Sequence, residues 1–405
     1  MQFNGNGETH LTYCSNIHPG ESWRDHFEQL KLYLPELKQR LSPDQPFGVG
    51  LRLSAAAAKE LLENAGIEEL NQWLDAEGLY LFTINGFPYG SFHHSRVKDN
   101  VYAPDWGSEQ RLSYTLDLVK ILAELLPEGI DGGISTSPVS YKYWDRDGQA
   151  EDELIGSACR NLAEMAYEMG LVQKQSGKEL HLDIEPEPDC LIENSVETVR
   201  FFQDHLLPKG MEHLVEHHGV DRGEAVQLLK NHIRVCYDTC HFAVEFEEPA
   251  DAVRRLTEAG IRIGKTQISA ALKVELGTSE EERQALRDQL QEYVESTYLH
   301  QVVERRKDGS LRQYRDLPDA LPHITDPDAG EWRIHFHVPI FTGQMGRLHS
   351  TRDHIVGGMQ PLLENSDCRH FEIETYTWEV LPDSLKVDIV DSIEREFRWF
   401  LKLDR

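Results

Sequence analysis

The chain has 405 residues, of which 40% are hydrophobic, and its formal net charge is −29. This length and apolar content suffice for one large domain, whereas the negative charge would repel a phosphate backbone, which argues against a nucleic-acid partner. The sequence shows no apolar stretch of about 18 residues that could span a membrane, no secretory signal and no CxxC spacing among its six cysteines, a combination typical of a cytoplasmic protein with reduced thiols.

Short strand-like runs alternate with segments of helical periodicity along the whole chain. The strand-like runs are residues 9–16, 47–54, 79–85, 132–137, 179–185, 233–238, 261–268, 332–341 and 371–376. The helical segments are residues 23–41, 55–65, 108–126, 151–169, 196–207, 224–232, 249–259, 352–364 and 382–401. This alternation is typical of parallel βαβ units, whose right-handed crossovers wind an open sheet or close a barrel.

The ends of the strand-like runs favour the barrel. Almost every run ends on a polar residue, namely Asn16, Ser54, Asn85, Ser137, Glu185, Asp238, Gln267 and Glu374. An open sheet collects ligands at its switch point only, whereas a barrel collects them from all eight strand ends. A glycine-rich phosphate loop after the first run is also missing. We therefore predict an α/β fold, a single (β/α)8 TIM barrel over residues 1–405.

Nine runs do not fit eight barrel positions, and we expect residues 332–341 to lie outside the barrel. They follow an insertion, residues 272–330, in which we expect an acidic helix and a hairpin with an Asp-Gly turn. A second insertion, residues 186–231, precedes the sixth strand. Both leave the carboxyl ends of strands, so both can cover a site on the C-terminal face.

One strand has an unusual distribution of ionisable side chains. Successive side chains of a strand face opposite ways, so three aliphatic residues of the run 179–185 share one face, and His181, Asp183 and Glu185 share the other. In a barrel the apolar face meets the helices, so the ionisable face lines the interior. Burial of three such groups is costly unless they are paired or bind a cation. The alternative is a half-exposed strand of an antiparallel sheet.

The same inward pattern recurs in three further runs. The inward ionisable residues are Glu372 and Glu374 in one run, Asp238 in another, and His335 and His337 in the third. Four such runs favour a metal site. Its carboxylates suit Mn2+ or Mg2+, and Zn2+ if the histidines take part.

Two groups of residues near the strand ends are further candidates. In the motif Asp238-Thr239-Cys240-His241, a carboxylate at a strand end and an imidazole in the following turn can reach one cation or one substrate; a hydrogen-bonded turn is the alternative. The substrate-binding candidates are Asn16, His18, Asn85, His93 and Lys265. For Lys265 an internal ion pair is the alternative.

These motifs resemble the xylose-isomerase-like TIM-barrel superfamily, which includes sugar isomerases, epimerases and AP endonucleases. The resemblance rests on Glu185 in Asp-Ile-Glu-Pro, on Asp238-x-x-His241 and on Glu374 in the final strand, and it extends over residues 11–376. More narrowly, three segments resemble the EboE family, the barrel proteins of the Ebo metabolite-traffic gene cluster. They are residues 11–20, 85–90 and 335–339.

The resemblance implies one divalent metal ion held by Glu185, Asp238 and Glu374. The epimerases add a histidine from the seventh strand and an aspartate three residues later, where this chain has Gln267 and Ala270. Glutamine can ligate through its carbonyl but cannot transfer protons. His335 or His337 would then replace the imidazole, as in the nuclease branch. That branch also needs early-strand histidines, where this chain offers Asn85 and Ser137.

Three functions remain open at this point. The first is a metal-dependent isomerase or epimerase of a small sugar-like or polyol metabolite, in which Mn2+, Mg2+ or Zn2+ stabilises an enediolate. Glu185 and Glu374 would move the proton and His241 would orient a ligand or hydroxyl. The second is a non-catalytic metabolite-binding or trafficking protein. The glutamine at position 267, where the epimerases have a histidine, motivates this alternative. The third is a metal-assisted phosphoester hydrolase. The sequence leaves open whether the chain forms a homo-oligomer.

Overall fold

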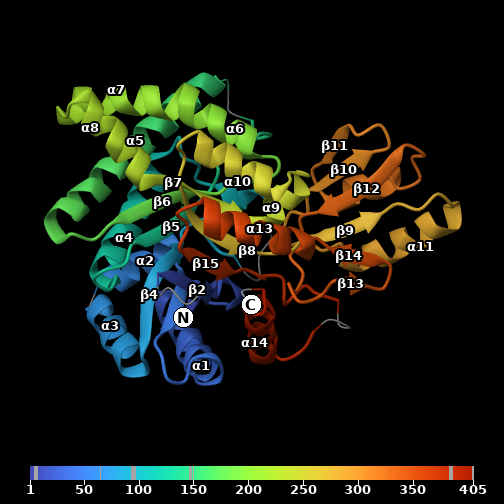
Figure 1. Ribbon diagram of the computed structural model, residues 1–405, viewed down its shortest axis with the longest axis horizontal. Coiled ribbons are helices and arrows are strands. Elements are labelled where there is room, and N and C mark those ends of the chain that lie inside the picture. The colour runs from blue at the N-terminus through green and yellow to red at the C-terminus, as the bar shows by residue number, and fades with distance from the viewer. Residues whose placement is uncertain are drawn as a thin grey trace.

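The structure is a computed structural model that describes residues 1–3, 8–63, 65–92, 97–145, 148, 150–382 and 386–403. It contains a barrel of strands surrounded by helices, and a smaller sheet that projects from one side of the barrel (Figure 1). Over these ranges, no helix combines the length and the apolar character that a membrane crossing requires.

The barrel consists of eight parallel strands. They are β2 (Thr9–Tyr13), β3 (Phe47–Arg52), β4 (Leu79–Asn85), β5 (Gly132–Thr136), β6 (Leu180–Ile184), β7 (Ile233–Asp238), β8 (Ile263–Ile268) and β15 (His370–Ile373). The sheet runs in the order β2-β15-β8-β7-β6-β5-β4-β3. A parallel bridge between Cys14 and Gly50 brings β3 back to the chain that follows β2. The two-residue strand β1 (Gln2–Phe3) pairs antiparallel with β2. The predicted TIM barrel is confirmed.

Helices cover the outside of the barrel (Figure 1). They are α1 (Trp23–Leu41), α2 (Ala55–Leu62), α3 (Gly66–Glu77), α4 (Glu109–Leu125), α5 (Glu151–Ser176), α6 (Ser195–Arg200), α7 (Leu207–His218), α8 (Arg222–His232), α9 (Thr239–Val244), α10 (Pro249–Glu258), α13 (Arg352–Asn365) and α14 (Ile389–Phe400). A π-helical turn, Phe201–Leu206, joins α6 to α7. Several begin at a residue whose side chain accepts a backbone N–H of the first turn, including Ser22, Ser54, Ser108 and Asp221.

The second sheet is antiparallel and is formed by residues between β8 and α13. Its order is β11-β10-β12-β9-β14-β13, with β9 (Leu272–Glu275), β10 (Val302–Arg306), β11 (Leu311–Tyr314), β12 (Ala329–Ile334), β13 (Gln344–Met345) and β14 (Leu348–Ser350). The helices α11 (Glu280–Leu290) and α12 (Leu317–Ala320) lie in the same segment. The run 332–341 therefore does lie outside the barrel, because residues 332–334 belong to β12 and residues 335–341 form no strand.

The alternation along β6 sets the contents of the barrel. Leu180, Leu182 and Ile184 are fully buried in the main hydrophobic core, and the ionisable side chains take the other face. His181 Nδ1 lies 2.7 Å from Asp183 Oδ1, and a Cβ on Gly264 of β8 would come within 2.0 Å of Asp183 Oδ1. The ionisable face thus fills the barrel interior, and the antiparallel alternative for this strand is wrong.

Candidate functional site

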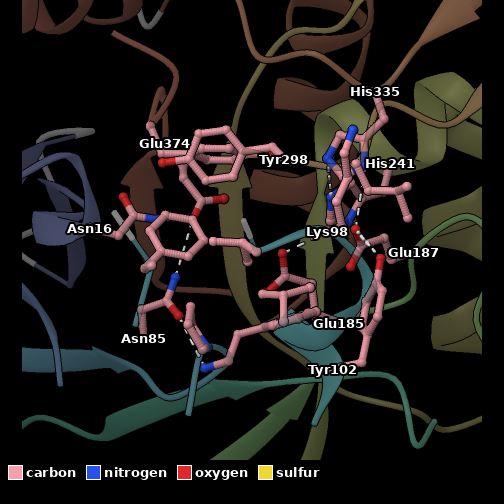
Figure 2. A pocket seen from close by; sticks show the side chains of 17 residues that line it. Asn16, Asn85, Lys98, Tyr102, Glu185, Glu187, His241, Tyr298, His335 and Glu374 are labelled. Carbon is pink, nitrogen blue, oxygen red and sulfur yellow. Dashed lines mark hydrogen bonds and ion pairs between the residues drawn. The ribbon is translucent and has the colours of Figure 1, made fainter. Parts of the chain in front are cut away.

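A cavity of about 60 Å³, large enough for several water molecules, lies at the carboxyl ends of the barrel strands (Figure 2). Its polar lining from the strand ends consists of Asn16, Asn85, Glu185, Glu187, His241 and Glu374, and residues of the second sheet and its loops add Tyr298 and His335. Side chains from the ends of five barrel strands and from the insertion therefore meet at one place, as expected for the C-terminal face of a TIM barrel.

Glu374 joins three of the strand ends. Its Oε1 accepts a hydrogen bond from Asn16 Nδ2 at 2.7 Å and another from Asn85 Nδ2 at 3.1 Å. Both contacts are visible in Figure 2. Two amide donors from the first and third strands therefore fix the carboxylate of the eighth and stabilise its charged form.

Asp238 has one oxygen in a turn and one oxygen free. Its Oδ1 accepts the backbone N–H groups of Cys240 and His241, at 2.6 and 3.1 Å, and the Ser269 hydroxyl at 2.6 Å. Its Oδ2 is buried without a hydrogen-bond partner in the part of the chain that the structure describes. The motif is thus both a hydrogen-bonded turn at the start of α9 and a ligand candidate.

Three histidines, His241, His335 and His337, which we call the histidine trio, have the same hydrogen-bonding pattern. In each, Nδ1 faces a carbonyl oxygen. For His241 this is the backbone carbonyl of Pro186 at 3.0 Å, for His335 the side-chain carbonyl of Gln301 at 2.8 Å, and for His337 the backbone carbonyl of Glu374 at 2.7 Å. A carbonyl oxygen only accepts, so each Nδ1 carries the hydrogen, and in the neutral ring each Nε2 carries a lone pair. This tautomer is the one that binds a metal through Nε2.

The orientation of the Gln301 amide supports this assignment for His335. Gln301 Nε2 donates to the Tyr102 hydroxyl at 3.0 Å and to the Pro188 carbonyl at 3.2 Å. The amide oxygen is therefore the atom that faces His335, and it can only accept.

The ligand atoms of the trio lie close to carboxylates. Those of Asp238, His241 and His337 lie within 4.8 Å of one another, and so do those of Glu187, His241 and His335. His241 Nδ1 lies 3.8 Å from Glu185 Oε1. The site therefore combines imidazole nitrogens with carboxylate oxygens from β6 and β7.

Buried carboxylates repel one another at this site. Burial, together with the charges of Glu374 and Asp238, raises the pKa of Glu185 well above its usual value. Burial and the charges of Asp238 and Glu372 do the same to the pKa of Glu374. A divalent cation would remove this repulsion and favour the ionised carboxylates.

Burial also acts on the histidines. It lowers the pKa of His337 to about 4 and that of His335 well below the usual value. Neutral imidazoles are the form that ligates a metal.

Several buried polar atoms at the site have no hydrogen-bond partner among the described residues: Glu185 Oε2, Asp238 Oδ2, His337 Nε2 and both polar atoms of Gln267. Orphaned buried groups of this kind are rare and call for an explanation, such as a bound ion. The set of oxygen and nitrogen donors could hold one divalent cation, to which Gln267 could offer its amide oxygen.

Two substrate-binding candidates, Lys265 and His18, take other positions. Lys265 Nζ lies 2.6 Å from Glu372 Oε2 in a fully buried ion pair, so the internal pair is what forms. His18 follows the 3-10 helix Ser15–Ile17, where its Nε2 meets the Tyr13 hydroxyl at 2.8 Å and its ring stacks on Tyr33 at 4.3 Å. The turn directs it away from the cavity. His93 lies outside the described residues.

Some site residues carry little sequence signal. Glu187 follows Glu185 by two residues and accepts a hydrogen bond from the Tyr102 hydroxyl at 2.8 Å; the repeated Glu-Pro of residues 185–188 would have pointed to it. Tyr298 and Gln301 come from the long insertion, and only the tertiary fold brings them to the barrel.

No protein-family model matches the chain, and no curated protein matches it in sequence. Among solved structures, it is similar to a xylose isomerase-like TIM barrel protein from Mycobacterium smegmatis in complex with magnesium. The TM-score is 0.50 at 11% identity, over 100% of this chain and 98% of that one. It is also similar to a D-tagatose 3-epimerase-like protein (TM-score 0.49, 11% identity, 97% of each chain) and to the IolI protein with a binding zinc atom (TM-score 0.46, 11% identity, 97% of this chain and 98% of that one). The likeness to the first of these structures supports the α/β TIM-barrel fold.

Proposed function

We propose that this protein is a metal-dependent isomerase or epimerase of a small sugar-like or polyol metabolite. One observation carries the proposal: two buried carboxylates, Glu185 and Glu374, line a single small cavity from well-separated barrel strands, beside a set of orphaned ligand atoms. Such a pair suits the removal of a proton at one face of a carbon and its return at another.

The cation would be held by Glu185, Asp238, Gln267 and Glu374, with the histidine trio supplying nitrogen ligands. When bound, a divalent cation binds substrate oxygens and stabilises the negative charge that develops as the proton leaves.

The two carboxylates have different surroundings, and we assign different roles to them. Glu374 receives two amide hydrogen bonds, from Asn16 and Asn85, which favour its charged form and suit a base. Glu185 Oε2 is buried without such a donor among the described residues, which suits the protonated partner. The two titrate as a coupled pair, and the roles would exchange for the reverse reaction. His241, held by the Pro186 carbonyl, would orient a ligand or hydroxyl.

The walls of the cavity indicate the kind of substrate. Phe87, Phe92, Tyr298 and Tyr376 provide apolar faces, and the polar groups converge at the strand ends. A few placed polar groups within an apolar wall are typical of a small-molecule site. The small volume favours a compact metabolite with adjacent hydroxyl or carbonyl oxygens.

The proposal is tested by conversion of sugar-like metabolites in deuterium oxide with Mn2+, Mg2+ or Zn2+ supplied. We expect one substrate to incorporate solvent deuterium without a change of composition. Glu374→Gln should reduce turnover by at least 100-fold while substrate binding changes little. The matched control is Glu396→Gln, because Glu396 is a buried glutamate outside the cavity lining. Equal loss of binding and turnover in Glu374→Gln would contradict the acid/base role.

A second candidate is a metabolite-binding or trafficking protein on the same barrel. Gln267 favours it, because a glutamine cannot transfer protons, and so does the resemblance to the EboE family. Tight binding of a metabolite without deuterium incorporation, across all three metals, would support this candidate over the first.

A further inference from the structure

A second cluster of possible ligands lies at the opposite, amino-terminal end of the barrel. It consists of Asp131, which precedes β5, His181 of β6 and His370 of β15. The His181 Nε2 atom is 3.5 Å from Asp131 Oδ2, and the His370 Nε2 atom is 3.2 Å from Asp131 Oδ1. Ligand atoms around a tetrahedral zinc lie about 3.4 Å apart, given zinc–ligand bonds of about 2.0–2.1 Å.

The two contacts have ion-pair distances but lack hydrogen-bond geometry. Both histidines are buried, and within the described ranges neither Nε2 atom has a partner in that geometry. Two imidazole nitrogens therefore approach one carboxylate at ligand-like distances with poor hydrogen-bond alignment, which calls for an explanation.

The tautomer of His181 suits a metal ligand. Its Nδ1 lies 2.7 Å from Asp183 Oδ1, so Nδ1–H donates to this carboxylate, and in the neutral ring the lone pair lies on Nε2. A carboxylate that holds the far side of a ligating imidazole is a common support of zinc sites.

Two glycines leave room for the cluster. A Cβ on Gly133 of β5 would lie 2.6 Å from His181 Cε1 and 3.1 Å from His370 Nδ1. A Cβ on Gly264 of β8 would lie 2.5 Å from His181 Nδ1. The neighbouring strands thus carry no side chain where the imidazoles need space.

An ion can reach the cluster from solvent. A cavity of about 750 Å³ opens at this end of the barrel and is lined by Asp131, His10 and Glu179 among others. The Asp131 side chain is 20% exposed. The route therefore ends on the one ligand of the cluster that faces the cavity.

We propose that Asp131, His181 and His370 bind a structural Zn2+ ion, which joins β6 and β15 to the segment before β5. Two neutral imidazoles and one carboxylate are a donor set that zinc prefers, with water as the fourth ligand. The site is separate from the cavity at the carboxyl ends and does not depend on the proposed function.

Arg234 competes for one oxygen of Asp131. Its NH1 lies 3.2 Å from Asp131 Oδ2, and its NH2 is paired with Glu179. Oδ1 is left for the metal. Because an Asp131 variant would also disturb Arg234, the histidines are the better positions to change.

The test measures zinc in a background in which the other candidate groups are disrupted. At the upper site, Asp238→Asn removes a ligand of the group Asp238, His241 and His337, and His335→Phe removes the imidazole shared by the groups that contain Cys240 and Glu187. His218→Ala disrupts a surface group in which Glu164 and His213 are the other members. After equilibration with zinc and gel filtration, elemental analysis should find one Zn2+ per chain. Co2+ in its place should give the absorption of a tetrahedral nitrogen and oxygen site. A background protein that folds and holds no zinc would overturn the proposal.

A variant of the cluster itself completes the test. His370→Phe removes the nitrogens and keeps an aromatic ring beside Phe82, whose centroid is 5.0 Å from that of His370. We expect the affinity of this variant for zinc to fall at least 100-fold. The absorption bands of the tetrahedral Co2+ site should disappear. The matched control, His354→Phe, changes a buried histidine outside this cluster and should retain both. Unchanged zinc binding in folded His370→Phe would refute the site. If the combined background fails to fold, His370→Phe is made in the otherwise unchanged chain. That variant should bind one Zn2+ per chain fewer than the wild type, and an unchanged zinc content would refute the proposed site.

Discussion

The Nε2 atoms of His241 and His335, two side chains labelled in Figure 2, lie 3.2 Å apart. The Nδ1 atom of each faces a carbonyl oxygen. Two lone pairs therefore point at each other in a buried site. A proton or a cation between them would turn this repulsion into attraction.

We expect Zn2+ or Mn2+ to stabilise the protein through these lone pairs. At a metal concentration about 100-fold above Kd the gain is about 2.7 kcal/mol, seen as a rise in Tm that a chelator reverses. His335→Phe should show a much smaller metal-dependent shift. The comparison is made in His370→Phe protein, so that the lower cluster does not contribute. Equal metal-dependent shifts in Tm with and without the His335 imidazole would contradict the assignment of His335 as a metal ligand.

The buried ion pair of Lys265 with Glu372 should respond non-additively to substitution. Both side chains are fully buried and lie 2.6 Å apart. Lys265→Met leaves an uncompensated carboxylate and should cost roughly 3–5 kcal/mol of the free energy of unfolding in urea. Lys265→Met with Glu372→Met should recover most of this loss. Losses that simply add in the double variant would show that the pair is not coupled.

Glu396 should make stability depend on pH. Burial raises its pKa from 4.5 to about 7, so the folded state binds the proton more tightly than the unfolded state. Its contribution is fully present below pH 4.5 and is lost as the pH rises through 7. The free energy of unfolding of the wild type, relative to Glu396→Gln, should therefore fall by up to about 3 kcal/mol between pH 4 and 8. A constant difference across this range would contradict the prediction.

Gly264 should tolerate no side chain. A Cβ there would lie 2.0 Å from Asp183 Oδ1 inside the barrel, so Gly264→Ala should destabilise by roughly 1–3 kcal/mol. Gly357→Ala is the control, because its Cβ would meet Pro249 at 3.9 Å on helix α13. The control should be neutral or slightly stabilising. Thermal unfolding of both variants makes the comparison, and equal effects would argue against a crowded barrel interior.

The barrel and much of the cavity lining were predictable because they follow from local rules. Alternation along β6 assigns Glu185 to the interior, and the position of Glu374 at a strand end brings it to the same face. The placement of His18 was not predictable, because a single 3-10 turn after β2 changes its direction.

The contribution of the insertion was predictable only in part. His335 and His337 show strand alternation, but Gln301 and Tyr298 reach the barrel through tertiary contacts that leave no periodic pattern. The ion pair of Lys265 was likewise not predictable, because it depends on which inward side chain of β15 lies beside Lys265 in the fold.

Anomalous X-ray diffraction from crystals grown with Zn2+ or Mn2+ would locate a divalent cation at the carboxyl ends of the strands. We expect an anomalous peak within bonding distance of Asp238 Oδ2 and at least one Nε2 of the histidine trio, and no such peak in Glu185→Gln/Asp238→Asn crystals. A well-ordered site without a peak, at metal concentrations far above those of a cell, would contradict this expectation.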